Sequence, residues 1–418
     1  MRILVLSGGG RGDMQPYAAL ASGFRQAGCE VTLACVPEFT FLLEGRGIEP
    51  WISDVKVKEL FESDDAIEMF ASGKNPVRMV RLFTRLMIPV LEQGMADLMR
   101  VIPGVDGLVL SSMSFLTGTG GMERVGVPTV AAYPFPTAAS REYPAILAPP
   151  LPSWLPGRSL YNRVSHWLLA RLIHFFLGRH HLRIMERLPL PSRPAPLPLP
   201  LLFGFSPQVF ARPADWPTHT SITGYWFLDR LPGWTPPAEL AAFLDAGEPP
   251  VYVGFGSMNT RDPAAATSLV CQALERAGRR GILVTGMGGL RREDLPSHVL
   301  ALDSVPHDWL FEQVAAVVHH GGAGTTAAGL RAGKPTICVP HMADQFFWSR
   351  RVLELGVGPR PISRKRLSVE ALTQAIQTAT TDRGMQQQAT VLGERIRQER
   401  GVDEAVERAL QHFRQGRA

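Results

Sequence analysis

The chain has 418 residues, of which 45% are hydrophobic and 19% charged. This composition is typical of a globular protein with an ample core, and it excludes a disordered chain or a membrane-spanning bundle. The net charge of +5 comes from dispersed arginines rather than a basic block, so no nucleic-acid partner is indicated. A chain this long exceeds one ordinary core, and two domains of about 200 residues each are expected.

The cysteines and the N-terminal segment indicate the compartment. Cys29, Cys35, Cys271 and Cys338 form no CxxC pair and lie in or beside apolar segments, as expected in a reducing environment. The segment MRILVLSGGG has the pattern of a short buried strand and lacks the apolar length of a signal peptide. We therefore expect a cytoplasmic protein. We expect it to be a monomer or a homodimer, and its positive net charge is compatible with a peripheral contact with an anionic membrane surface.

Short apolar runs alternate with longer helical patterns, first in one half of the chain and then again in the other. Strand–helix alternation predicts parallel sheets covered by helices on both faces, and its repetition predicts two doubly wound α/β domains. The runs predicted as strands are 2–6, 31–36, 106–112 and 128–133, then 250–257, 281–286, 315–320 and 335–340.

A segment rich in proline, glycine and tryptophan separates the two halves and predicts a linker. Ligands of open α/β sheets bind beyond the carboxyl ends of the strands, so two such domains facing each other predict a cleft. A helical pattern from about Met385 to Arg414 predicts a helix that returns toward the first domain. The expected divisions are a first domain at 1–212, a linker at 213–237, a second domain at 238–395 and the returning helix at 396–418.

The first candidate motif is SGGGRGDMQPYAALA (7–21), where a strand meets a glycine-rich turn and then a helix. Asp13 lies where the turn becomes helix. Aspartate is a preferred N-cap, but a carboxylate there also suits a general base for a hydroxyl. Arg11 is either a surface cation or a contact to a phosphate group.

The second motif is VVHHGGAGTTAAGLRAG (317–333), again a strand, a glycine-rich turn and a helix. A helix N-terminus with small residues holds an anion through its unpaired N–H groups and dipole. The hydroxyls of Thr325 and Thr326 and the ring N–H of His320 add donors; the alternative is an ordinary turn with Thr325 as cap. A zinc site on His319 and His320 is not expected, because adjacent strand residues point to opposite faces.

Two further segments carry candidate binding residues. Asp344 and Gln345 follow the strand predicted at 335–340, and neighbouring carboxylate and amide groups suit vicinal sugar hydroxyls, although Asp344 could also be a cap. In SVPHDWLF (304–311), Trp309 packs either against a nucleotide base or in the core.

Taken in order, these motifs resemble those of the inverting nucleotide-sugar glycosyltransferases of the GT-B fold. The similarity is greatest to the branch of sterol glucosyltransferases and bacterial glycopeptide and macrolide glycosyltransferases. The correspondence is dense over 250–360 and clear over 2–22. It rests on GGRGDMQPYAALA, GFGSM, VPHDWLF, HHGGAGTTAAGLRAGKPTICVP and ADQFFWSRRV.

The resemblance implies two Rossmann-like domains, the first for the acceptor and the second for the nucleotide-sugar donor. Asp13 matches the catalytic base, and one displacement inverts the anomeric carbon without an enzyme nucleophile. The implied co-substrate is UDP-glucose or a dTDP-sugar, with no bound cofactor and no metal. The implied donor-binding residues are Gly10, Arg11, Gly12, Ser257, Val305, Trp309, His320, Gly322, Ala323, Gly324, Thr325, Thr326, Asp344 and Gln345.

Two departures from plant relatives matter. Those relatives use a histidine near position 13 as base, and they carry a ribose-binding glutamate where this chain has Ala328. The first places the chain with the bacterial and sterol-acting branch, and the second leaves UDP and dTDP both open.

The acceptor end is apolar and aromatic. The segments 83–89 and 133–147 predict acceptor contacts at Phe83, Met87, Tyr133 and Phe135, which suit a sterol, polyketide, flavonoid or glycolipid aglycone. A helical pattern at 158–188 combines apolar residues with arginines and histidines. We expect it to pack in the first domain's core, and a membrane-surface helix is the alternative.

The expected function is transfer of a hexose to a hydroxyl of a lipophilic small molecule by an inverting O-glycosyltransferase. Two alternatives stay open: a nucleotide-sugar epimerase on a similar scaffold, and a non-catalytic module that binds a nucleotide sugar or a lipid. A nicotinamide dehydrogenase is disfavoured, because neither glycine turn has the dinucleotide spacing.

Overall fold

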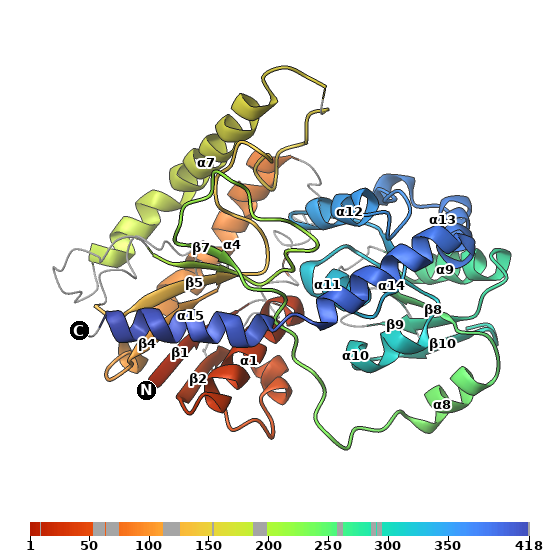
Figure 1. Cartoon of the computed structure of the whole chain (residues 1–418), viewed down its shortest axis with the longest axis horizontal. Helices are drawn as coiled ribbons and strands as arrows, with labels where there is room; N and C mark the ends of the chain where they lie inside the picture. The colour runs from red at the N-terminus through yellow and green to blue at the C-terminus, as the bar shows by residue number, and fades with distance from the viewer. Residues whose placement is uncertain are drawn as a thin grey trace. The chain divides into compact units, whose positions relative to one another are not determined.

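The computed structural model describes residues 1–8, 10–52, 63, 75–111, 126–152, 154–186, 199–256, 262–285, 290 and 295–416, without the side chains of 76, 79, 87, 89–97 and 177–186. The chain divides into two compact units (Figure 1). Unit 1 comprises Met1–Leu228 and Arg400–Ala418, and unit 2 comprises Asp229–Glu399.

Unit 1 is built on a parallel sheet in the order β3-β2-β1-β4-β5-β6-β7. The order reverses direction between β1 and β4, which are neighbours with Ile3 opposite Gly107. The strands are β1 (Arg2–Leu6), β2 (Glu30–Cys35), β3 (Glu49–Ile52), β4 (Gly107–Leu110), β5 (Thr129–Tyr133), β6 (Leu201–Phe203) and β7 (Thr220–Ile222).

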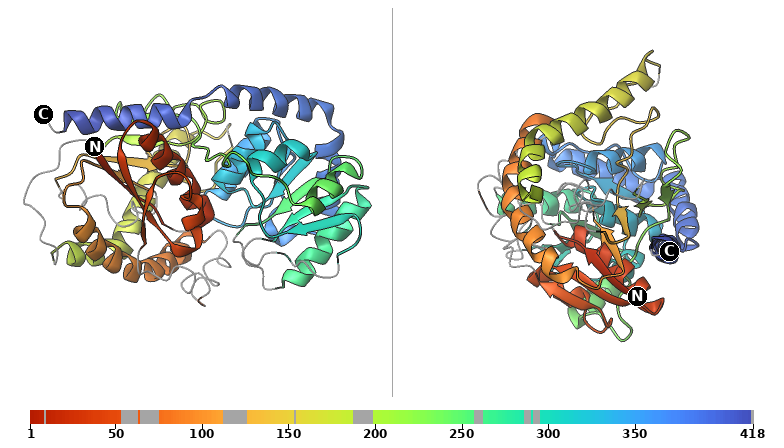
Figure 2. Two further views of the ribbon diagram at one scale, coloured as in Figure 1. Left: turned by 90° about the horizontal axis from the view of Figure 1, so that it is seen from below. Right: turned by 90° about the vertical axis from the view of Figure 1, so that its left-hand side faces the viewer.

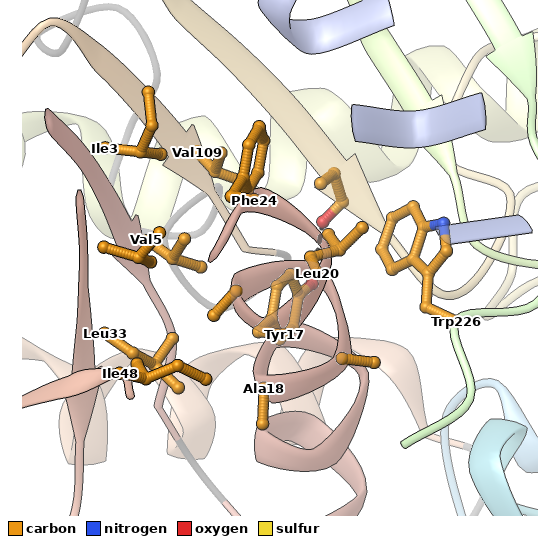
Figure 3. Packing of buried hydrophobic residues seen from close by; sticks show 14 of the residues in the cluster. Ile3, Val5, Tyr17, Ala18, Leu20, Phe24, Leu33, Ile48, Val109 and Trp226 are labelled. Carbon is orange, nitrogen blue, oxygen red and sulfur yellow. Dashed lines mark hydrogen bonds between the residues drawn. The ribbon is translucent and has the colours of Figure 1, made fainter. Parts of the chain in front are cut away.

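Helices α1 (Arg11–Gln26) and α15 (Gly401–Gln415) cover one face of this sheet. Tyr17 and Phe24 of α1 pack against alternate strand residues such as Ile3 and Val5 (Figure 3). The ring of Phe413 in α15 lies 6.3 Å from that of Phe24. The C-terminal helix lies along the other elements of unit 1 (Figure 2), and its buried side chains complete the core of that unit.

The other face carries α4 (Pro76–Val101) and α7 (Arg158–Glu186), which run side by side. Leu4, Leu6 and Leu98 form its core, and Ile173 of α7 packs against that cluster. The alternation of Ile3 and Val5 with Leu4 and Leu6 is the period of two that a strand buried on both faces requires. A short 3-10 helix, η1 (Pro37–Leu42), follows β2.

Unit 2 has a second parallel sheet in the order β10-β9-β8-β11-β12, which reverses between β8 and β11. Its strands are β8 (Val251–Gly254), β9 (Gly281–Val284), β10 (Val299–Leu302), β11 (Ala316–His319) and β12 (Thr336–Cys338). Its helices are α8 (Ala238–Asp245), α9 (Pro263–Arg276), α10 (His307–Leu310), η3 (Phe311–Gln313), α11 (Ala323–Arg331), α12 (Gln345–Glu354), η4 (Arg364–Arg366), α13 (Val369–Thr381) and α14 (Arg383–Arg397).

The structure differs from the sequence expectations in several elements. Strands β3, β6, β7 and β10 were not predicted, since each has only three or four residues and too little pattern to identify. Strand β7 and the buried Trp226 lie within 213–237, the segment expected as a linker. The helix predicted from about 385 to 414 is divided at 398–400 into α14 and α15. In the segment 188–200, six prolines predict an extended connector, and all but residues 199 and 200 lie outside the described residues.

Candidate active site

The first group of candidate residues lies at the switch point of unit 1. Between the carboxyl end of β1 and the start of α1, the chain turns through the N-cap Gly10. Asp13 is the third residue of the helix, and its Oδ2 accepts a hydrogen bond of 3.1 Å from the Gly10 N–H. Gly10, and not Asp13, is therefore the N-cap, but the Asp13 carboxylate still caps the helix from its third position by accepting the Gly10 N–H. The carboxylate is left one turn inside, at the edge where doubly wound sheets bind ligands.

Burial changes the acidity of Asp13. It raises the pKa of the carboxyl from 3.8 to about 6, and the hydrogen bond from Gly10 opposes this only in part. The carboxylate is thus ionised at neutral pH yet more basic than an ordinary aspartate. A partly buried carboxylate of this basicity has the properties of a general base. Beside it, the Arg11 guanidinium lies 6.0 Å from the Phe41 ring, and Gly12 is exposed.

The second group lies at the switch point of unit 2, where β11 ends beside β8. His319 is fully buried at the end of β11, and its Nδ1 accepts a 2.9 Å hydrogen bond from the Gly321 N–H. This bond places the proton of the neutral ring on Nε2, which faces the Cys338 thiol at 3.9 Å. Burial lowers the pKa of His319 well below its usual value. Gly321 adopts φ +85°, a conformation that favours glycine. His319 thus holds the glycine turn in place through its hydrogen bond with Gly321.

His320 occupies the mouth of this turn. Its ring fits between Gly256 and Gly322. A Cβ added at Gly256 would lie 3.0 Å from Cε1 of the His320 ring, and a Cβ added at Gly322 would lie 2.5 Å from its Nε2. Among the described residues, nothing hydrogen-bonds the buried Nδ1 of His320. Burial and the neighbouring His341 lower its pKa to about 4. The neutral imidazole can therefore contribute an N–H donor at pH 7 but no charge.

Helix α11 begins at Ala323, directly after His320 and the glycines. Its N-cap is Gly322, so the interpretation of Thr325 as cap is wrong. The first-turn N–H groups of Ala323, Gly324 and Thr325 have no partner within the helix, as in any first helical turn. The Thr326 hydroxyl instead donates a hydrogen bond to the Gly322 carbonyl at 2.8 Å, which stabilises the helix.

The turn that follows β12 abuts the glycine turn. The backbone carbonyl oxygen of Gln345 would lie 3.0 Å from a Cβ added at Gly321, so only glycine fits there. Ala343 has φ +49°, the one non-glycine residue with positive φ in the described chain. Such backbone strain in an L-residue is often found at functional sites.

Asp344 and Gln345 behave differently in this turn. Asp344 occupies the N-cap position of α12, yet its side chain makes no capping hydrogen bond to that helix. Gln345 is buried, and its Oε1 accepts hydrogen bonds from the N–H groups of His341 at 2.8 Å and Met342 at 3.0 Å. The amide oxygen of Gln345 therefore holds the turn, and a sugar contact would involve its amide nitrogen.

The remaining donor-side candidates are distributed as follows. Val305 is 1% exposed and packs in the core, so any contact to a nucleotide base would come from its backbone. Trp309 is partly exposed, and its ring lies 5.2 Å from that of Trp234. Ser257 lies outside the described residues. Gly10, Arg11 and Gly12 are in unit 1, whereas all the other described donor-side candidates are in unit 2.

The four residues predicted to contact the acceptor differ in how exposed they are. Phe83 in α4 and Phe135 after β5 are partly exposed, as a ligand contact requires. Tyr133 is fully buried, with its ring 6.4 Å from that of Phe203, so it presents no exposed surface and its contact with an acceptor stays a prediction. The side chain of Met87 lies outside the described residues.

Sequence reasoning missed three residues of the site in unit 2. His319 was considered only as a metal ligand, Gly256 was not singled out within GFGSM, and His341 was not considered beside Asp344. The signal for His319 was its place at the end of a buried strand, followed by a second histidine and then two glycines. No sequence signal indicates that Gly256 and Gly322 make room for one imidazole, because that depends on the pairing of β8 with β11.

Three observations bear on cofactors and surroundings. In the described residues, no cluster of three or more His, Cys, Asp or Glu side chains could hold a metal ion. All four cysteines are buried and unpaired. No helix in the described ranges combines the length and apolar character needed to cross a bilayer.

Comparison with known proteins identifies the family. Residues 284–409 match the profile of the erythromycin biosynthesis protein CIII-like C-terminal domain. Over 97% of its length, the chain is 34% identical to an O-mycaminosyltylonolide 6-deoxyallosyltransferase of Streptomyces fradiae, of which it covers 96%. The chain belongs to this glycosyltransferase family. The glycosyltransferase is also 34% identical, over 97% of its length, to a sterol 3-beta-glucosyltransferase of Emericella nidulans, but it spans only 30% of that longer protein.

Solved structures agree on the fold of this glycosyltransferase. The glycotransferase of kitacinnamycin matches with a TM-score of 0.70 and 18% identity, covering 99% of each chain. The Streptomyces sp. SF2575 glycosyltransferase SsfS6, complexed with thymidine diphosphate, matches with a TM-score of 0.65 and 19% identity, covering 98% of this chain and 99% of the other. The expected GT-B fold is thereby confirmed.

Proposed function

We propose that this protein is an inverting O-glycosyltransferase that moves a hexose from a UDP- or dTDP-sugar to a hydroxyl of a lipophilic small molecule. The observation that carries the proposal is the position of the Asp13 carboxylate, in the first turn of α1 at the switch point of unit 1, where burial also raises its pKa to about 6. The family membership supports the transfer of a sugar. The names of the relatives support a macrolide-like or sterol-like alcohol as acceptor.

In the proposed reaction, the Asp13 carboxylate takes the proton of the acceptor hydroxyl. The acceptor oxygen forms its bond to the anomeric carbon as the bond from that carbon to the diphosphate oxygen breaks, so the configuration inverts. The nucleoside diphosphate leaves with the bonding electron pair. With a pKa of about 6, Asp13 is largely ionised above pH 7 and accepts a proton more readily than an ordinary aspartate.

The leaving group needs stabilisation of its growing negative charge. In unit 2, the N–H groups at the start of α11 and a ring N–H of His320 supply preorganised donors, and the helix dipole adds a positive potential. We propose that these groups take the part a metal ion plays in other enzymes, so that EDTA leaves turnover unchanged. Asp344 and the amide nitrogen of Gln345 are proposed to bind the donor sugar, and Trp309 the base. Arg11 and the exposed Gly12 are proposed donor contacts from unit 1.

The first experiment measures thermal stability with saturating UDP, dTDP, GDP or NAD. A ligand at 100 times its dissociation constant adds about 2.7 kcal/mol, enough to raise a melting temperature visibly. Stabilisation by UDP or dTDP alone supports the donor site and names the nucleotide. Stabilisation by NAD alone, or by none of the four, sinks the proposed donor site.

The second experiment concerns Asp13→Asn, with Glu38→Gln as a matched control that neutralises an exposed carboxylate of the same unit. Asp13→Asn should lower transfer at least a hundredfold and leave donor affinity nearly unchanged, whereas the control should transfer normally. Wild-type turnover should fall as the pH drops below about 6. Donor binding without turnover in the wild type would favour the binding-module alternative, and epimerised donor without acceptor would favour the epimerase.

A third variant addresses the diphosphate. His320→Ala removes the ring donor and should weaken UDP or dTDP binding about tenfold or more, because a hydrogen bond to a charged group is worth about 1.5–3 kcal/mol. Equal nucleotide affinity in the variant would refute the role of His320.

A further inference from the structure

Helix α7 exposes several large apolar side chains along one face and buries two polar ones, Asn162 and Ser165. Sequence reasoning predicted core packing for this helix, and that prediction is wrong for most of its apolar residues. The exposed fractions are 68% for Leu160, 40% for Val164, 57% for Trp167, 53% for Leu168 and 72% for Phe175. Their spacing places them within a stripe of about 100° on one helix face. Trp154, just before the helix, is 78% exposed.

The opposite side of the helix is held to unit 1 by polar contacts. Asn162 is fully buried and donates to the Arg141 carbonyl at 2.8 Å. Ser165, also buried, accepts from the Ala145 N–H at 2.8 Å. His166 Nε2 lies 3.1 Å from the Tyr143 carbonyl. These bonds fix the rotation of α7 about its axis, so the apolar stripe is a property of the folded unit and not of a loose helix.

The charge around the stripe is positive. The sequence of α7 contains five arginines and a single acid, Glu186, at its end. Arg171 lies within the stripe, with its guanidinium 5.5 Å from the Trp167 ring, and Arg163 is exposed beside it. The neighbouring α4 exposes three further arginines in its first turns, Arg78, Arg81 and Arg85. An apolar aromatic stripe that carries the exposed Arg163 and Arg171 matches the chemistry of an anionic bilayer surface.

We propose that α7 is a membrane-docking helix that lies in the headgroup region of an anionic lipid bilayer, with Trp167, Leu168 and Phe175 inserted and Arg163 and Arg171 at the lipid phosphates. A second copy of this chain is a poorer occupant. In a twofold interface the stripe would meet itself, and its arginines would face one another without an acidic partner on the helix. The proposal does not depend on the reaction catalysed.

The test measures sedimentation of the full chain with lipid vesicles. One set of vesicles is phosphatidylcholine alone, and the other contains about 30% phosphatidylglycerol, which gives the surface a clear negative potential. The wild type should bind the anionic vesicles at least tenfold more tightly, and added salt should weaken binding. The variant Trp167→Ser/Leu168→Ser/Phe175→Ser should lose at least tenfold in binding. Because the replaced side chains are exposed, its melting temperature should not fall.

A charge variant and two matched controls separate the contributions. Arg163→Gln/Arg171→Gln should lose about fivefold per arginine at low salt. In unit 2, Leu231→Ser/Leu353→Ser/Val391→Ser replaces three side chains that are each 40% exposed and should bind as the wild type does. Lys365→Gln/Arg366→Gln removes two exposed cations there and should also have little effect.

Three results would overturn the proposal. One is a wild type that binds neither kind of vesicle. Another is equal binding to neutral and anionic vesicles, which would remove the arginines from the interaction. The third is a wild-type dimer in sedimentation velocity that becomes a monomer in the serine variant without vesicle binding, which would assign the stripe to a second copy.

Discussion

At the scale of single residues, burial shifts the pKa values of the two candidate chemical groups, Asp13 and His320, in opposite directions. Burial raises the pKa of Asp13 to about 6 and lowers that of His320 to about 4, because it disfavours the charged form of each. At pH 7 the first is a comparatively basic carboxylate and the second a neutral donor. In the proposed reaction, the base must be ionised and the residue that binds the diphosphate must donate a hydrogen bond, and these are the states of Asp13 and His320.

The raised pKa of Asp13 has a consequence for stability. Because the folded-state pKa exceeds the ordinary value of 3.8, this group contributes most stability below pH 4 and loses that contribution as the pH rises through about 6. Asp13→Asn should therefore raise the melting temperature of unit 1 by a few degrees at pH 7.5. The gain should vanish near pH 4. Calorimetry of both proteins across this range checks the expectation, and a variant less stable at pH 7.5 would contradict it.

His319 offers a prediction about positioning. Leucine at this site would leave the Gly321 N–H buried without an acceptor, which costs about 1–3 kcal/mol. His319→Leu should therefore lower stability and weaken nucleotide binding, whereas His319→Asn keeps an acceptor near the place of Nδ1 and should recover much of the binding. Isothermal titration with UDP or dTDP measures this. Equal losses in the two variants would show that His319 acts only by filling space.

At the scale of elements, the units depend on helices that approach their sheets closely. Gly107 at the start of β4 lies under the fully buried ring of Phe413 in α15, where an added Cβ would meet ring carbons at 2.7 Å. Glycine is required there by contact with a distant helix, since its backbone is not in the left-handed region. Likewise, Gly23 in α1 faces Val402 and Val406 of α15.

Gly107→Ala should overpack this contact and destabilise unit 1 by about 1–3 kcal/mol. Denaturant unfolding measures the loss, with Gly8→Ala as control because nothing lies within 4 Å of a Cβ there. Adding Phe413→Leu should return part of the lost stability, since the smaller side chain leaves room. Losses that simply add in the double variant would show that the two residues do not interact.

Helix α7 illustrates why an amphipathic pattern alone is ambiguous. Its apolar spacing predicted a helical segment at 158–188, and the helix is present over Arg158–Glu186, but the spacing did not show which side faces the protein. The buried polar contacts of Asn162 and Ser165 decide that orientation, and they come from a loop around 141–145 that no periodicity marks.

At the scale of the whole molecule, the chain consists of two units with separate cores, and the last helix belongs to the first of them. Candidate residues lie at the switch point of each sheet, Asp13 in unit 1 and His320 in unit 2. The two groups can therefore be perturbed one at a time.

We expect two separable unfolding transitions in calorimetry. Ala409→Asp would place an unpaired charge in the core of unit 1 and should lower only the transition that nucleotide does not shift. Ala379→Asp, at an equally buried site in unit 2, should lower the nucleotide-sensitive transition. A single transition that both variants lower alike would show that the units unfold together.

The sequence by itself determined the family, the two parallel sheets and the turns that hold Asp13 and His320, because each follows from local order: an apolar strand, then glycines, then a helix. Only the tertiary structure decided which candidates face outward. It buried Tyr133 and Val305 and engaged Gln345 and Thr326 in internal hydrogen bonds. It also turned the apolar face of α7 to solvent. Strand order, close helix approach and burial depend on contacts between distant segments, and a pattern of neighbours along the chain does not encode them.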